Sequence, residues 1–354
     1  MPATMRDVAA RAGVSVKTVS NFFNGYPYMR EETRARIGAA VEELDYRVNV
    51  SARSLRRGSS GMISLIVPEL DQAYFAELAQ EVIDAAAPLG LTVLVETTSY
   101  LRERELDALS GVHRQLIDGA IFDPLALGPD DAPDLARSLP LVIIGERQFE
   151  GLADHVLIAD EEVARRVVEH LLEIGRRRIL LLGAGSPGTH TAVLRRRGSV
   201  AALARAGLTP DEALFVEVDG WNRDAGARAT ARALESGLRF DAVFGFNDAL
   251  ALGAQWELLE RGIAVPGDVA VAGVDDTRDA RFAHPTLTTM SPGRAQIARL
   301  AVELLARRIS EPTAPDGFVS VTADFELIVR DSTRSPASLA SLDRRPPRQK
   351  DGLR

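Results

Sequence analysis

The 354-residue chain contains no cysteine, which excludes disulfides, thiolate metal sites and cysteine nucleophiles and is compatible with a reducing cytoplasm. The histidines are few and scattered, without the spacing that metal ligands require, so neither a metal nor a cofactor is expected. They are His113, His155, His170, His190 and His284.

The sequence also lacks long apolar runs. None approaches the roughly 20 residues of a membrane span, and the N-terminus lacks the charged-then-apolar pattern of a signal peptide. We therefore expect a cytoplasmic protein with no membrane partner. A hydrophobic content of 46% with 26% charged residues is typical of a globular protein, and the length predicts two or three compact units.

The net charge of −8 is divided unevenly along the chain. Residues 1–60 hold ten Lys/Arg and six Asp/Glu, a net charge of +4, which leaves −12 for the other 294 residues. A basic head on an acidic body is expected when only the head approaches phosphates.

Residues 4–24 predict two short helices joined at a glycine. Thr4 caps the first helix, with Asp7 in its first turn. Gly13 permits the positive φ of a tight interhelical turn. The first helix places three small or apolar residues on one face: Val8, Ala9 and Ala12.

Ser15 caps the second helix, in which Val19 and Phe22 are predicted to face inward. The predicted outer face consists of Val16, Lys17, Thr18, Ser20 and Asn21. The caps, the turn glycine and this Lys-bearing polar face together indicate a helix-turn-helix that binds DNA. A third helix is predicted over Arg30–Leu44, with Ile37, Val41 and Leu44 on one stripe.

Beyond the boundary Gly58-Ser-Ser-Gly61, apolar strands alternate with amphipathic helices. The predicted strands are Met62–Val67, Thr92–Glu96, Gly119–Phe122, Leu141–Gly145, Val156–Ala159, Arg178–Leu182, Phe215–Val218, Ala242–Phe246 and Val269–Val274. Nearly continuous apolar strands separated by helices indicate parallel sheets covered on both faces, here an α/β core of two doubly wound lobes. Ligands would bind in the cleft between the lobes, at the carboxyl ends of the strands.

The predicted domain boundaries follow from these patterns. A helix-turn-helix head spans residues 1–47, a hinge and linker 48–60, and an effector-binding and dimerisation core 61–330. Residues 331–354 are Ser-, Pro-, Arg- and Asp-rich without periodicity, and we predict a disordered tail.

Five motifs resemble the lactose/galactose repressor (LacI/GalR) family of bacterial transcription regulators. They are Asp7-Val-Ala-x-x-Ala-Gly-Val-Ser-x-x-Thr-Val-Ser, Tyr46-x-x-Asn49-x-x-Ala52-x-x-Leu55, Phe246-Asn247-Asp248, Val265-Pro-x-Asp-Val-Ala-Val-x-Gly273-Val-Asp275-Asp276 and Pro285-x-Leu-Thr-Thr289. The resemblance implies a head that binds palindromic operator DNA and a core resembling periplasmic sugar-binding proteins. It also implies a homodimer, and no leucine heptads of the kind that drive tetramers follow the core.

In the head, Val16, Lys17 and Asn21 match positions that read base edges in the family. Physically, Lys17 is suited to guanine O6/N7 and Asn21 to bidentate pairing with adenine. Hydroxyls or helix-start amides suited to phosphate contacts come from Thr4, Ser15, Thr18 and Ser20.

The segment Asn49–Arg57 matches the family's hinge helix, which forms when two protomers meet over the operator. Leu55 matches the leucine that wedges into the minor groove and kinks the duplex. The resemblance places Asn49, Ala52 and Arg53 beside it in the DNA-binding segment. Val48 stands where relatives commonly have proline, and Arg30 where serine often caps the third helix.

For the effector, the resemblance implies a small sugar-type molecule held between the lobes. The matching residues are Tyr74, Phe75, Thr189, Thr191, Arg195, Trp221, Asn247 and Asp275. Flat aromatic side chains with carboxylate, amide and guanidinium groups suit a polyol, because its CH faces stack and its hydroxyls need paired hydrogen bonds. A purine-like corepressor is also compatible with these residues, since the same aromatics would stack a base.

Three charged residues admit more than one role. Asp248 is a candidate cap for a helix beginning at Ala249, and Arg147 and Asp160 are candidates for an interior ion pair or for ligand contact.

Two further protein classes share some of these patterns. Gly183–Gly188 fits the dinucleotide pattern G-x-G-x-x-G, but Pro187 interrupts the helix start and no acid follows at the required spacing, so a dehydrogenase is disfavoured. A solute-binding protein would share the core but would not need residues 1–57. We therefore expect a regulator rather than an enzyme.

Overall fold

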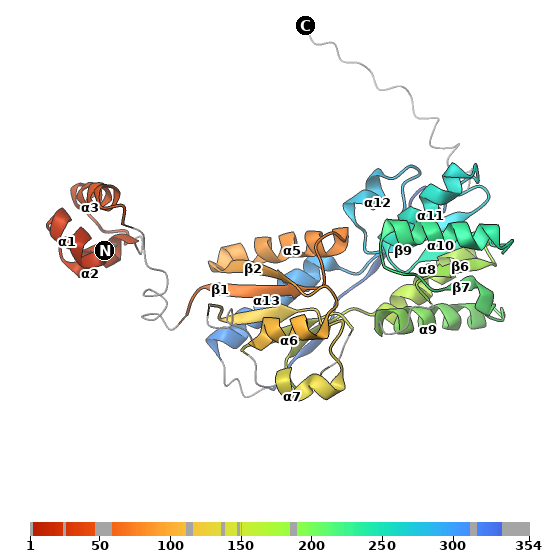
Figure 1. Cartoon of the computed structure of the whole chain (residues 1–354), viewed down its shortest axis with the longest axis horizontal. Helices are drawn as coiled ribbons and strands as arrows, with labels where there is room; N and C mark the ends of the chain where they lie inside the picture. Colours follow the sequence, from red (N-terminus) through yellow and green to blue (C-terminus); the bar gives the residue numbers. More distant parts are fainter. Residues whose placement is uncertain are drawn as a thin grey trace, which may run out of the picture. The chain divides into compact units, whose positions relative to one another are not determined.

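The structure, a computed structural model, describes residues 3–23, 26–46, 59–110, 116–135, 139–146, 149, 151–184, 190–311 and 317–334. The chain divides into two compact units, Met1–Ser60 and Gly61–Arg354 (Figure 1). Each unit has its own hydrophobic core.

The smaller unit contains three helices, α1 (Met5–Ala12), α2 (Val16–Phe23) and α3 (Glu31–Glu43). Thr4 and Asp7 form the predicted capping box: the Thr4 amide donates to Asp7 Oδ2 at 2.8 Å, and the Asp7 amide donates to Thr4 Oγ1 at 3.4 Å. Gly13 ends α1 with φ +63°, as the turn requires. Seven buried side chains hold the helices together: Val8, Ala9, Ala12, Val19, Ile37, Ala40 and Tyr46. The predicted helix-turn-helix is confirmed.

The first lobe of the larger unit is a six-stranded sheet in the order β11-β5-β4-β3-β1-β2, parallel throughout. Its strands are β1 (Met62–Val67), β2 (Thr92–Thr97), β3 (Gly119–Phe122), β4 (Leu141–Ile144), β5 (Asp154–Leu157) and β11 (Ser320–Thr322). Its helices are α5 (Ala73–Ala86), α6 (Arg102–Ser110), α7 (Ala132–Leu135) and α13 (Arg294–Ser310). Alternate residues of β1 pack on opposite faces: Leu65 contacts the core under α5 and α13, and Ile66 the core under α6 and α7.

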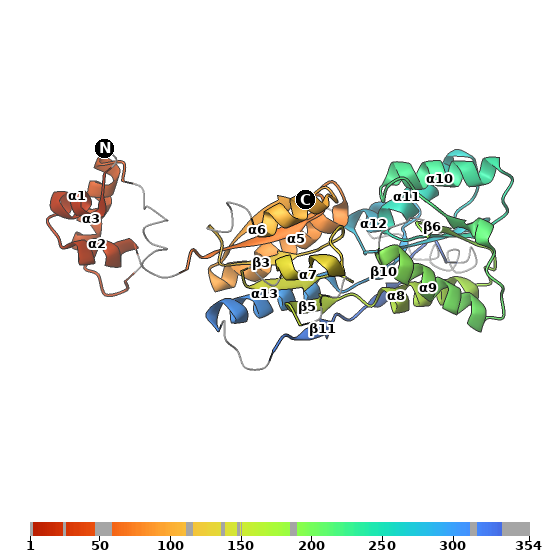
Figure 2. The ribbon, with the colours of Figure 1, turned by 60° about the horizontal axis from the view of Figure 1, so that its bottom comes forward.

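The second lobe repeats this arrangement in the order β12-β10-β9-β8-β6-β7, with only β12 antiparallel. Its strands are β6 (Ile179–Leu182), β7 (Phe215–Val216), β8 (Ala242–Gly245), β9 (Ala270–Val274), β10 (Thr288–Ser291) and β12 (Glu326–Ile328). Its helices are α8 (Asp160–Glu173), α9 (His190–Arg205), α10 (Arg223–Glu235), α11 (Asp248–Glu260) and α12 (Arg278–Phe282). The pair α8 and α9 packs on one face and the pair α10 and α11 on the other (Figure 2). The predicted two doubly wound lobes are confirmed.

The chain passes between the lobes three times. The connections are β5 to α8, β10 to α13, and β11 to β12. As a result α13, which follows the second-lobe strand β10, packs against α5 in the first lobe.

Two predictions from the sequence need correction. Three strands, β10, β11 and β12, were not predicted, because they are short and lack a long apolar run. Residues 331–334 are not part of a disordered tail. Ser332 is buried, its hydroxyl donates to the Val271 carbonyl at 2.6 Å, and it accepts from the Thr288 amide at 2.8 Å. Polar composition concealed this short segment, which is anchored to the second sheet.

Candidate functional sites

Five of the eleven residues predicted to contact DNA lie on α2. Lys17 is exposed, and Ser20 and Asn21 are half-buried. Val16 was expected to face outward, but it packs partly against the head core, so only part of it is available for a base edge. The rest of the predicted outer face remains polar.

The hydroxyls of the head are occupied in caps. Ser15 Oγ accepts from the Thr18 amide at 3.1 Å and lies 2.8 Å from Thr18 Oγ1, while Thr4 Oγ1 donates to Asp7 Oδ2 at 2.7 Å. The hydroxyl hydrogen of Thr4 is thus already donated to Asp7, whereas the helix-start amides have the orientation that binds phosphate. The hinge predictions, Asn49, Ala52, Arg53 and Leu55, lie outside the described residues, as does Thr189.

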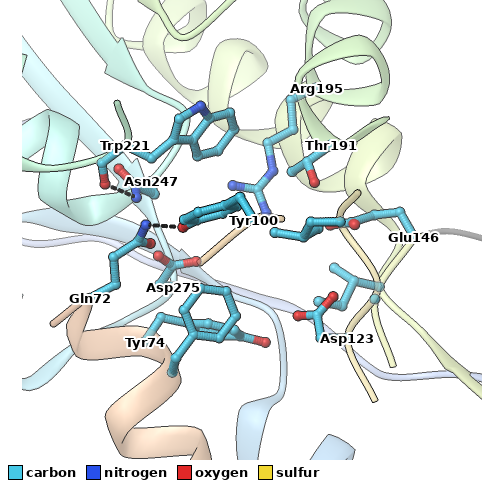
Figure 3. A pocket seen from close by; sticks show the side chains of 14 residues that line it. Gln72, Tyr74, Tyr100, Asp123, Glu146, Thr191, Arg195, Trp221, Asn247 and Asp275 are labelled. Atoms are coloured by element: carbon cyan, nitrogen blue, oxygen red, sulfur yellow. Dashed lines mark hydrogen bonds between the residues drawn. The ribbon is translucent and has the colours of Figure 1, made fainter. Parts of the chain in front are cut away.

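A pocket lies between the two lobes of the larger unit (Figure 3). Its empty space is about 650 Å³, part of it open to solvent. Seven of the eight residues predicted for effector contact line it: Tyr74, Phe75, Thr191, Arg195, Trp221, Asn247 and Asp275. The structure therefore brings together side chains that are up to about two hundred positions apart in the sequence.

Strand order explains this convergence. The segments after β1 to β5 supply the first-lobe lining, and those after β6 to β9 supply the second-lobe lining. Parallel strands deliver their carboxyl ends to the same edge of a sheet, so nine loops or helix starts meet at one crevice.

Aromatic rings form much of the pocket wall. The Tyr74 and Phe75 rings meet edge to face, with centroids 5.2 Å apart. Trp221, from the loop after β7, is half-buried, and its ring centroid is 6.3 Å from that of Phe246. These planes provide faces for a ring-shaped ligand.

Arg195 is buried and already engaged. Its Nε donates to Asp160 Oδ1 at 2.5 Å, its Nη1 donates to the Phe246 carbonyl, and its guanidinium lies 5.9 Å from the Trp221 ring centroid. Burial alone would lower the pKa of Arg195, but nearby carboxylates, Asp160 foremost, raise it above its usual value. The expected interior ion pair of Asp160 therefore involves Arg195; Arg147 lies outside the described residues.

Asn247, not Asp248, caps α11. Asn247 Oδ1 accepts from the Leu250 amide at 2.8 Å, and its Nδ2 donates to the Trp221 carbonyl at 2.9 Å. Asp248 is the first residue of the helix and points inward, where Oδ2 accepts from the Thr277 amide at 2.8 Å and Oδ1 from Thr289 Oγ1 at 2.5 Å. The side chain one position earlier is the cap because its residue is still extended.

Asp275 lies directly after β9 and is held in an unusual backbone conformation, with φ +119°. Burial raises the pKa of its carboxyl to about 7, against the opposing influence of Arg195 and Arg294. The Asp275 backbone carbonyl accepts from Arg294 Nη1 at 3.0 Å. This residue thus joins the pocket to α13.

Sequence reasoning missed seven lining residues: Gln72, Tyr100, Asp123, Leu125, Gly145, Glu146 and Ile158. Each lies in the first lobe and follows a strand of the structure. Position after a predicted strand could have found five of them; Gly145 and Ile158 lie within the predicted strands. Tyr100 and Gln72 are linked, since Gln72 Nε2 donates to the Tyr100 hydroxyl at 2.6 Å (Figure 3).

Two kinds of feature are absent from the described residues. They contain no helix long and apolar enough to cross a membrane. They also contain no cluster of three or more His, Asp or Glu side chains able to hold a metal ion.

Comparison with known proteins gives the same two-part division. Residues 4–49 match the model of bacterial regulatory proteins of the lacI family, and residues 168–333 match the periplasmic binding protein-like domain. The chain is 31% identical over 338 residues to the helix-turn-helix transcriptional regulator AscG of Escherichia coli, covering 94% of this chain and 99% of that protein.

Two solved structures are also similar. A transcriptional regulator of the LacI family from Sanguibacter keddieii is 49% identical with a TM-score of 0.71, covering 78% of this chain and all of that one. The lac repressor dimer bound to operator and the anti-inducer ONPF is 28% identical with a TM-score of 0.79, covering 95% and 100%. The chain therefore belongs to the LacI family of DNA-binding bacterial transcription regulators.

Proposed function

We propose that the protein is a repressor of carbohydrate-utilisation genes that binds a palindromic operator as a homodimer. A small sugar-type effector in the pocket between the lobes controls its affinity for that operator. The observation that carries this proposal is the pairing of an HTH head with a pocket lined from the strand ends of both lobes. The related lac repressor, a dimer on its operator, supports the dimer.

In the head, Lys17 and Asn21 read base edges, with Val16 contributing apolar contact from its exposed part. Thr4, Ser15, Thr18 and Ser20 contact phosphates and fix the register of α2 on the duplex. Between the heads, Asn49, Ala52 and Arg53 belong to a hinge segment whose Leu55 inserts into the minor groove.

In the core, Thr189, Thr191, Arg195 and Asn247 supply polar contacts to the effector, and Asp275 accepts hydrogen bonds from its hydroxyls. Effector closes the lobes and changes the spacing of the two heads, so hinge pairing is lost. A coupling free energy of about 1–3 kcal/mol would change operator occupancy by roughly 5- to 150-fold.

Fluorescence-anisotropy binding tests the proposal. The full-length protein is titrated against DNA from upstream of its own and neighbouring genes, with and without a panel of sugars and purines. We expect salt-sensitive, palindrome-dependent binding that one sugar releases. If a purine strengthens DNA binding, the effector is instead a corepressor. A purine base could also stack on the aromatic side chains of the pocket. Failure to bind any fragment above the level of unrelated DNA would contradict the repressor proposal.

A further inference from the structure

The pocket is lined by more carboxylate groups than the binding of a neutral ligand requires. Three carboxylates line it, Asp123 after β3, Glu146 after β4 and Asp275 after β9, and each is exposed by only 8–9%. They come from both lobes and face one space (Figure 3). Buried like charges repel one another strongly unless a cation or protons neutralise them.

The arginines near the pocket neutralise these acids only in part. Arg195 is paired with the fully buried Asp160. Arg294 is held by Glu77 at 2.6 Å and by Glu81 at 3.2 Å. Both guanidinium groups thus have their own carboxylate partners, and the three lining acids remain in excess.

Asp123 is the least compensated of the three. Within the described part of the chain, no hydrogen bond to its carboxylate is present, although the residue is more than nine-tenths buried. Neighbouring Glu105 differs, because its carboxylate accepts from the backbone amides of Leu125, Ala126 and Leu127. Asp123 is thus a buried acceptor that points into an open space without a donor.

We propose that the effector is an amino sugar, whose ammonium group lies among Asp123, Glu146 and Asp275 while its ring packs between the aromatic walls. This inference rests on the proposed effector site and narrows its ligand class. An ammonium group brings three donors and a positive charge, so it satisfies Asp123 and relieves the repulsion at once. The faces of Tyr74 and Trp221 cover the CH surfaces of the ring and attract the cation.

The titration behaviour of the pocket agrees with this geometry. Burial and the neighbouring carboxylates of Glu146 and Glu105 raise the pKa of Asp123 well above its usual range. Burial, followed by Asp275, Asp123 and Glu146, raises the pKa of the Tyr74 hydroxyl well above its usual range. A bound ammonium group would favour the ionised form of Asp123, which a neutral polyol would not do.

Calorimetric titration of the full-length protein near neutral pH tests the inference. The probes are glucosamine, galactosamine and mannosamine, each compared with its parent hexose and its N-acetyl form. We expect at least one hexosamine to bind roughly tenfold or more tightly than both neutral counterparts. Equal or tighter binding of a neutral counterpart would overturn the inference, as would the absence of saturable binding by all three hexosamines at millimolar concentration.

Charge-neutral variants locate the ammonium group. Asp123→Asn and Glu146→Gln are each expected to lower the ratio of hexosamine affinity to hexose affinity by roughly tenfold. Asp107→Asn, which removes an exposed acid from α6 in the same lobe, is the matched control and should change neither affinity. An unchanged ratio of hexosamine to hexose affinity in Asp123→Asn would contradict the placement.

Operator binding by the same preparations separates the two proposals. A protein that binds its operator and ignores hexosamines disproves only the ligand class. A protein that binds hexosamines but no upstream DNA supports the ligand class and contradicts the repressor proposal.

Discussion

At the scale of single residues, buried carboxylates determine how stability responds to pH. The pKa of Asp275 is about 7 in the folded protein, against an ordinary value of 3.8. Between these values the folded state holds a proton that the unfolded state has released. The contribution of this group to stability is therefore present at low pH and is lost as pH rises towards 7.

Replacing Asp275 with Asn should reduce this pH dependence. The amide cannot ionise, so the variant avoids the cost of charging a buried acid and should gain stability relative to the parent at about pH 8 but not at about pH 4. Urea denaturation of the protein without effector at both pH values measures the difference. Asp107→Asn, at the surface, should behave as the parent; an Asp275→Asn variant with the parent's pH profile would refute the argument.

Pocket residues could be predicted from the sequence only where they belong to a recognisable motif. Trp221, Asn247 and Asp275 belong to family motifs or to a distinctive loop, and all three line the pocket. Asp123 and Glu146 follow ordinary apolar strands, and a single acid in a loop is indistinguishable from a solvated one until the two sheets face each other. Their place in the pocket depends on how the two lobes face each other, which local sequence does not encode.

At the scale of elements, glycines set the distance between neighbouring helices. A Cβ on Gly253 of α11 would lie 2.0 Å from the Arg223 carbonyl oxygen, and one on Gly226 of α10 would lie 2.3 Å from the Leu250 carbonyl oxygen. The two helices therefore touch backbone to backbone. Because α10 begins just after Trp221 and α11 just after Asn247, this contact also fixes the hydrogen bond between those two residues.

Gly253→Ala should therefore destabilise the core and disturb the pocket together. Overpacking of this kind typically costs about 1–3 kcal/mol, and the helices must separate to accept the methyl group. Thermal unfolding and effector titration measure the two effects. Gly38→Ala in α3, where a Cβ meets nothing within 4 Å, is the control and should be neutral or slightly stabilising. Equal melting temperatures for Gly253→Ala and the parent would contradict this account of the packing.

The elements that sequence patterns predicted best are the long apolar strands. Met62–Val67 and Gly119–Phe122 match β1 and β3 residue for residue, because nearly continuous burial leaves a mostly apolar run. The strand after Arg178 was placed within one residue. By contrast β12 contains only Glu326–Ile328 and pairs antiparallel with β10, so its existence depends on a partner strand rather than on its own composition.

The segment after β12 gives a second prediction at this scale. Ser332→Ala removes a hydroxyl that bonds both Val271 and Thr288, and should cost about 1–3 kcal/mol because buried partners lose their hydrogen bonds. Ser320→Ala on β11, where the residue is exposed, should change stability by less than about 0.5 kcal/mol. Urea denaturation compares the two. Similar small losses in both variants would show that residues 331–334 do not anchor the sheet.

At the scale of the whole molecule, the residues proposed to contact DNA and those proposed to contact the effector belong to separate units. A basic head of net charge +4 precedes a body of −12, so raising salt should weaken operator binding while changing effector affinity little. In the proposed function, effector binding to one unit changes the operator affinity of the other. Variants that remove one activity and spare the other test it directly.

Leu55→Ala should weaken operator binding and leave effector affinity intact, since the proposed minor-groove wedge lies outside the pocket. Asp275→Ala should do the reverse, abolishing the effector response while operator binding persists. Anisotropy and calorimetry on both variants complete the comparison. Equal loss of both activities in Leu55→Ala would remove the hinge role, and a normal response in Asp275→Ala would remove that residue from the site.

The three passages of the chain between the lobes have consequences for the synthesis and the proteolysis of this protein. Neither lobe is a continuous stretch of sequence, because α13 and β11 return to the first lobe after most of the second has been made. A ribosome therefore cannot finish the first lobe until the second is nearly complete. For the same reason a protease that severs any one connection leaves the halves joined by two others, so a nicked protein should remain a single particle on gel filtration.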